Sequence, residues 1–133
     1  MRKIILLLGA IGLSGCMTAA NDMLNNQYMN VTPTPNYISG IWTGTGGALL
    51  ITLKFNNDGT GIACTSYNGR NTLDKLKVYD GKIITQNGLK QTIENYSASE
   101  LKLKTSYLGG VTTTLRPDQN LSNTSIFCTN SLR

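Results

Sequence analysis

The fold is decided by the stretch LLITLKFNNDGTG, residues 49–61, in which a strand pattern runs directly into a tight turn. Apolar side chains occupy every second position, at Leu49, Ile51, Leu53 and Phe55. Such period-two alternation is typical of a β-strand with one face in the core. Asn57-Asp58-Gly59 follows, and Asp-Gly favours a hairpin because both residues tolerate positive φ. The stretch therefore predicts one arm and the turn of an antiparallel hairpin.

Working outward, the same succession of short strands and turns continues to residue 115. Extended segments are predicted at 61–67, 72–79, 82–85, 89–96, 101–107 and 111–115. The connections between them carry turn residues, at Asn68-Gly69, Asp80-Gly81, Asn87-Gly88, Ser97–Glu100 and Gly109-Gly110. About seven or eight strands joined by short turns predict an all-β antiparallel meander, closed into a small up-and-down barrel. A two-sheet β-sandwich is the alternative.

The chain beyond residue 115 departs from this pattern. Proline is favoured at the first position of a helix and excluded from mid-strand, so residues 116–121 are predicted to form one helical turn that begins near Pro117. Ser125 to Cys128 are predicted to add a short last extended segment.

The N-terminus reads as a targeting signal. Arg2-Lys3 precedes an apolar run from Ile4 to Leu13. As a helix this run would span about 15 Å, half of the roughly 30 Å hydrocarbon core of a bilayer, so it is too short to cross a membrane. A basic start followed by a short apolar run is typical of a signal peptide. The alternative is a buried N-terminal strand or helix with an incidental cysteine.

The end of this run, Leu13-Ser14-Gly15-Cys16, resembles the lipobox of bacterial lipoproteins. The resemblance implies acylation of Cys16, cleavage before it, and attachment to membrane lipid through the acylated residue. The next residue is Met17 rather than Asp, which by the same resemblance implies the outer membrane of the bacterial cell envelope.

The chain is accordingly divided into three parts. Residues 1–15 are predicted to be a cleaved signal peptide, residues 16–36 a lipidated N-terminus and flexible tether, and residues 37–133 a β-barrel-like domain. The tether prediction depends on a composition rich in Asn, Thr and Pro, without sustained periodicity.

Two further cysteines, Cys64 and Cys128, are predicted to pair. An oxidising compartment outside the cytoplasm preserves disulfide bonds, and these are the two cysteines left once Cys16 is lipidated. A bridge between them would close a long loop and stabilise the fold by on the order of 4 kcal/mol. Two free buried thiols are the alternative.

The composition disfavours several classes of function. The chain has no histidine, and its serines lack a Gly-x-Ser-x-Gly context, so we expect no catalytic residues, no metal site and no cofactor. The net charge is +5 with Lys and Arg dispersed, so we expect no nucleic-acid partner. The sequence does not indicate an oligomeric state.

Gly40-Ile41-Trp42, followed by a glycine-rich turn and a long hairpin, resembles the opening of the lipocalin and avidin-type barrels, the calycins. The resemblance covers residues 39–67 and implies that Trp42 closes one end of a barrel. The wider arrangement of Trp42, Asn57-Asp58-Gly59, Cys64 and Cys128 resembles a group of small bacterial lipoproteins, and this likeness implies no activity.

Four aromatic residues are candidates for a ligand or interface site: Trp42, Tyr67, Tyr79 and Tyr107. The function expected first is that of a membrane-anchored, non-enzymatic envelope lipoprotein with a structural role or an envelope protein or polymer as partner. The alternative is binding of a small ligand inside a calycin-like barrel. Because the domain is small and poor in aromatic residues, we expect a filled interior rather than a roomy one.

Overall fold

The structure is a computed structural model that describes residues 14–107 and 110–133. The predicted signal peptide, residues 1–15, lies outside the described residues except for its last two. The side chain of Cys16 also lies outside them, although the backbone there belongs to helix α1 (Ser14–Leu24). Among the helices that are described, none has the length and apolar character needed to cross a membrane.

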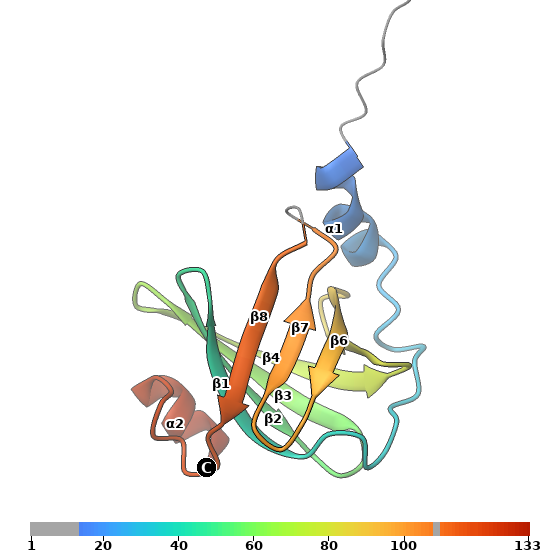
Figure 1. Ribbon diagram of the computed structural model, residues 1–133. Helices are drawn as coiled ribbons and strands as arrows, with labels where there is room; N and C mark the ends of the chain where they lie inside the picture. Colours follow the sequence, from blue (N-terminus) through green and yellow to red (C-terminus); the bar gives the residue numbers. More distant parts are fainter. Residues whose placement is uncertain (1–13, 108–109) are drawn as a thin grey trace, which may run out of the picture.

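Eight antiparallel strands form a closed barrel (Figure 1). They are β1 (Gly40–Gly46), β2 (Leu49–Phe55), β3 (Thr60–Tyr67), β4 (Arg70–Tyr79), β5 (Lys82–Thr85), β6 (Lys90–Tyr96), β7 (Leu101–Lys104) and β8 (Thr112–Pro117). Each strand pairs with its neighbours in the sequence, and β8 returns to pair with β1. The prediction of an all-β up-and-down barrel is confirmed, and the two-sheet sandwich is excluded.

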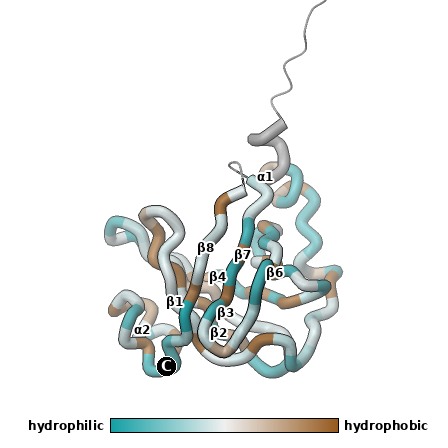
Figure 2. Tube along the Cα trace, in the orientation of Figure 1, coloured by the Kyte–Doolittle hydropathy of each residue, from teal (hydrophilic) through white to brown (hydrophobic). Residues whose placement is uncertain are grey.

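The barrel core follows from the alternation of side chains along the strands. In the hairpin that decides the fold, Trp42 lies opposite Leu53, and Leu53 lies opposite Ala63 on β3. These inward residues join Leu76, Leu101 and other buried side chains in one apolar cluster. Figure 2 shows the consequence along the tube, where hydrophobic positions on the strands are interrupted by polar ones.

A second apolar cluster lies outside the barrel, under the C-terminal helix α2 (Ile126–Leu132). Cys128 and Leu132, four residues apart and so on one helix face, are buried there with the outward side chains of Ile41 and Cys64. The predicted extended segment at Ser125–Cys128 is therefore wrong. Ser125 instead caps the helix, because its Oγ accepts a hydrogen bond from the backbone N of Cys128 at 3.1 Å.

The predicted helical turn at 116–121 is also wrong. Strand β8 continues to Pro117, which pairs with Trp42 at the end of the ladder, where a missing N–H is tolerated. The backbone then makes a tight turn in which Leu121 N donates to Asp118 O at 2.9 Å.

Residues 25–36, here named the N-terminal strap, run down the outside of the barrel from α1 (Figure 1). Lys77 Nζ donates to Tyr28 O at 2.7 Å and to Val31 O at 3.1 Å. Farther along, Thr34 N donates to Val78 O at 2.7 Å. The strap, which lies within the segment predicted as a flexible tether, is thus bound to β4 at Tyr28, Val31 and Thr34.

Candidate functional site

The two ends of the barrel differ. At one end Trp42 is 3% exposed, its indole Nε1 donates to Ser39 O at 2.9 Å, and its ring meets Tyr96 edge-on at 5.6 Å between centroids. Trp42 therefore closes this end, as the calycin resemblance implied, and offers no surface to a ligand. We name this the closed end.

The other half of the barrel contains a cavity of about 360 Å³. Thirteen residues line it: Leu49, Ile51, Leu53, Ala63, Thr65, Asp74, Ile83, Thr85, Asn87, Leu89, Gln91, Thr105 and Tyr107. The expectation of a filled interior is wrong for this half. Small inward residues leave the space, since β3 contributes Ala63 and Thr65 here.

The lining of the cavity is amphipathic. Its apolar side chains are Leu49, Ile51, Leu53, Ala63, Ile83 and Leu89, and the remaining lining residues are polar. A volume of about 360 Å³ falls at the lower end of the roughly 300–1,000 Å³ found for small-molecule sites, which combine apolar walls with a few polar groups. The arrangement can bind one compact amphiphile.

Tyr107 stands at the mouth of this cavity and is 8% exposed. Its hydroxyl donates to Asp22 Oδ2 at 2.6 Å and accepts from the backbone N of Lys90 at 3.0 Å. Burial, and after it the hydrogen bond to Asp22, raises the pKa of Tyr107 to about 12. Tyr107 therefore remains a neutral hydroxyl at the mouth at physiological pH.

The other aromatic candidates do not gather around the cavity. Tyr67 is 49% exposed at the end of β3. Tyr79 ends β4 and lies under the ammonium group of Lys82, with 6.0 Å from Nζ to the ring centroid. Of the four predicted residues, Tyr107 alone lines the cavity, and Trp42 lies at the closed end.

Asp74 is the charged lining residue that the sequence analysis did not single out. The signal was present, because Asp74 shares the parity of Leu76 and Val78, the apolar face of β4. Lys75 and Lys77 occupy the alternate positions of the strand, so the face that carries Asp74 is expected to point into the barrel. A carboxylate on an inward face is unusual.

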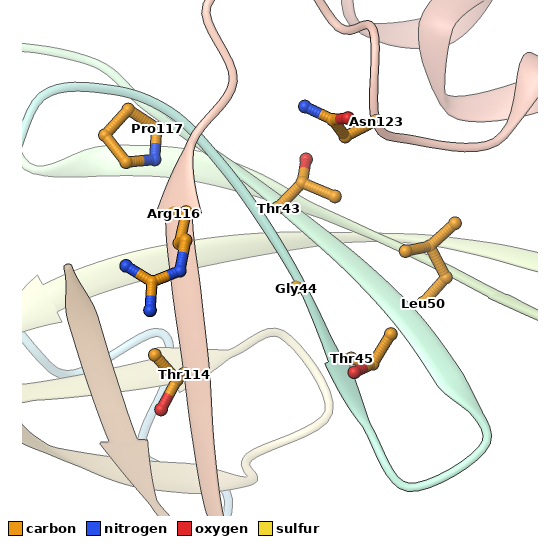
Figure 3. A pocket seen from close by; sticks show the side chains of 8 residues that line it. All are labelled: Thr43, Gly44, Thr45, Leu50, Thr114, Arg116, Pro117 and Asn123. Atoms are coloured by element: carbon orange, nitrogen blue, oxygen red, sulfur yellow. The ribbon is translucent and has the colours of Figure 1, made fainter. Parts of the chain in front are cut away.

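A second hollow, of about 430 Å³, lies on the outer surface beside α2 (Figure 3). Its lining residues come from β1, β2, β8 and the segment after β8: Thr43, Gly44, Thr45, Leu50, Thr114, Arg116, Pro117 and Asn123. Asp118 lies behind it, 3% exposed, and its carboxylate accepts from Thr43 Oγ1 at 2.9 Å and from Asn123 N at 3.2 Å. These bonds fasten the segment after β8 to the barrel, so we assign Asp118 a structural role.

The same segment is fixed a second time by the Cys64–Cys128 disulfide. The two sulfur atoms are 2.02 Å apart and the two Cα atoms 5.8 Å apart. The bond joins β3 to α2, the pairing that the cysteine count predicted.

Comparison with known proteins identifies the family. The chain matches the sequence model of the family described as "Bacterial lipocalin LPS transport optimiser YedD" over residues 25–132. The matched range contains the N-terminal strap, all eight described strands and the whole of α2. No match to this chain was found among curated proteins or solved structures. The match agrees with the lipocalin-like opening at Gly40-Ile41-Trp42 and with the closed eight-stranded barrel. This chain belongs to the YedD family of bacterial lipocalins.

Proposed function

We propose that this protein is a lipid-anchored, non-enzymatic accessory protein of the bacterial cell envelope that assists the transport of lipopolysaccharide. The single observation that carries the proposal is the match over residues 25–132 to a family whose description names that role. The protein would act by contact with an envelope protein or polymer of the transport route.

The lipobox-like Leu13-Ser14-Gly15-Cys16 supports a lipid anchor, and Met17 supports the outer membrane as its location. Helix α1 would set the distance between such an anchor and the barrel. Asp22 contacts Tyr107 at the mouth, and Cys16 precedes it by six residues of α1, which is about 9 Å of helix. An anchor at Cys16 would therefore hold the mouth of the cavity toward the membrane.

Exposed apolar side chains on α2 support contact with a partner. Ile126 is 83% exposed and Phe127 39% exposed. Leu73, also exposed, lies opposite Cys64 in the β3–β4 ladder, and Cys64 is bonded to Cys128 of α2. Neighbouring apolar side chains on an otherwise polar surface favour protein contact.

The proposal is tested in a bacterium from which the gene has been deleted, by following pulse-labelled lipopolysaccharide to the cell surface. We expect delivery to slow on deletion and to recover with the wild-type gene. Cys16→Ala should abolish labelling by a clickable palmitate and fail to restore delivery, whereas the neighbouring Ser14→Ala should restore it. Unchanged delivery on deletion contradicts the transport role, and palmitate labelling of the Cys16→Ala protein contradicts the anchor.

A second candidate function is the binding of a small ligand inside the barrel. The observation that favours it is the amphipathic cavity of about 360 Å³, which has Tyr107 among its lining residues. The two functions are compatible, since a bound ligand could accompany a role in transport.

A further inference from the structure

We propose that the barrel cavity selects amphiphiles with a positively charged polar end, and that Asp74 is the specificity-determining residue. This inference rests on the second candidate function, ligand binding in the cavity. It names the chemical class of the ligand: a compact hydrocarbon body that carries an ammonium or similar cationic group.

Asp74 is half-buried on the inner wall of the cavity, next to apolar residues. It sits opposite Ala63 in the β3–β4 ladder, and Ala63 sits opposite Leu53 in the β2–β3 ladder, so the three form one row across the inner wall. The next inward residue on β4 is Leu76, which is fully buried in the core. The carboxylate is therefore placed where a ligand that enters from the mouth meets the apolar floor.

No Lys or Arg in the part of the chain that the structure describes forms an ion pair with Asp74. Among the thirteen lining residues it alone has a carboxyl group, none is Lys, Arg or His, and Tyr107 remains a neutral hydroxyl. Within the described residues, the three ion pairs involve other carboxylates, those of Asp80, Glu94 and Glu100. The side-chain hydrogen bonds there do not include Asp74 either, whereas Asp118, the buried carboxylate outside the barrel, accepts several.

The cations nearest along β4 point away from the cavity. Lys75 and Lys77 alternate with Asp74 and Leu76 and so lie on the outer face of the strand. The ammonium group of Lys77 is also bound elsewhere, because its Nζ donates to two backbone oxygens of the N-terminal strap. At the mouth, Asp22 adds a second carboxylate beside Tyr107. Both carboxylates thus favour a positively charged ligand group at the mouth and in the interior of the cavity.

The carboxylate of Asp74 lies in a partly apolar enclosure. A carboxylate attracts a cation more strongly there than in bulk water, because the surrounding hydrocarbon lowers the effective dielectric constant. An anionic headgroup would meet repulsion from Asp74 and lose its hydration without a compensating partner. A phosphate or carboxylate group of a lipid is therefore disfavoured inside the barrel, and a cationic group is favoured.

The test uses three probes with one hydrocarbon body and different charges: adamantylammonium, adamantanol and adamantanecarboxylate. Each is titrated into the full-length protein, and binding is followed by methyl NMR shifts of Ile51, Leu53 and Ile83, which line the cavity. We expect adamantylammonium to bind at least about tenfold more tightly than adamantanecarboxylate, a factor that corresponds to about 1.4 kcal/mol.

The decisive variant is Asp74→Asn, which keeps the shape and removes the charge. We expect it to weaken adamantylammonium by about tenfold and to leave adamantanol unchanged. Asp80→Asn is the matched control, since it removes the same charge from the exposed turn that follows β4, and we expect it to change no affinity.

The experiment distinguishes failure of the charge selectivity from failure of ligand binding in the cavity. If all three probes shift the cavity methyl groups with equal affinity, or if Asp74→Asn leaves the preference for adamantylammonium in place, ligand binding stands and the charge selectivity is overturned. If no probe shifts those methyl groups, ligand binding in the cavity is overturned, and the selectivity falls with it.

Discussion

Tyr107 at the mouth of the barrel donates a hydrogen bond to Asp22 of α1 at 2.6 Å, across 85 residues of sequence. Nearby, Asn26 Nδ2 donates to Gln86 O at 2.7 Å. A Cβ at Gly88 would come within 2.5 Å of Asp22 O, so the β5–β6 turn accepts α1 only because this position is glycine, whose φ of +93° also suits it. The mouth of the cavity and the N-terminal segment are therefore one packed unit.

The Tyr107 hydroxyl should titrate near pH 12. Its pKa is raised to about 12 in the folded protein, so the neutral form is favoured by folding. The contribution of this group to stability is fully present below the unfolded pKa of about 10 and is lost as the pH rises through about 12. Tyrosinate absorbance should show a component near pH 12 that Tyr107→Phe removes and Tyr67→Phe leaves in place. Loss of that component in Tyr67→Phe alone would contradict the assignment.

Replacement of the barrel plug should be costly. Trp42→Ala removes a buried aromatic side chain and its hydrogen bond to Ser39 O, so we expect the free energy of unfolding to fall by about 3–5 kcal/mol. Denaturant unfolding measures this change. Before any substitution, the emission of Trp42, the single tryptophan, should be shifted to the blue and resist quenching by iodide. Emission like that of free indole in water would show that the residue is exposed.

The Cys64–Cys128 bond should be present in the native protein and stabilise it. The non-reduced protein should be about 2 Da lighter than the reduced protein, since two thiol hydrogens are lost on bond formation. The bond spans 64 residues, and chain-entropy arguments give on the order of 4 kcal/mol for a loop of this length. Cys64→Ala with Cys128→Ala should lower the free energy of unfolding in that range. Two thiols that react with an alkylating agent in the unreduced protein would contradict the bridge.

Replacement of Asp118 should lower the free energy of unfolding more than replacement of an acid on the surface. Asp118→Ala would leave the hydroxyl of Thr43 and the backbone N of Asn123 without their acceptor in a buried setting. We expect a loss of about 3 kcal/mol in the free energy of unfolding, whereas Asp58→Ala, at an exposed turn, should have a smaller effect. Equal effects of the two substitutions, measured by thermal unfolding, would contradict the buried network.

The barrel was predictable because its determinants are local. The alternation at Leu49–Phe55 and the Asp-Gly and Asn-Gly turns fix strands and hairpins within a few residues of one another, and a meander needs no long connection. The burial of Trp42 followed from the same local pattern together with the lipocalin-like opening.

The N-terminal strap and α2 were not predictable by the same means. Lys77 binds backbone oxygens of the strap, which any residue would supply. The amino-acid composition of the strap therefore does not reveal the contact. In α2, two buried residues four apart are too few to separate a helix from a strand by periodicity. The cavity depends on the summed volume of inward side chains from several strands, and that sum requires the registers that only the structure provides.

The return of β8 to β1 has a consequence for how other proteins recognise this one. Every described strand has a neighbour on both sides, but the β4–β5 ladder covers only Leu76–Tyr79 of β4, so residues 70–74 are paired with β3 alone. The closed barrel therefore leaves one short backbone edge on which an extended segment of another chain could be added. Elsewhere recognition must depend on side chains: the exposed residues of α2, the turns at either end and the outer hollow beside β8. Point substitutions at these places are expected to alter the choice of partner.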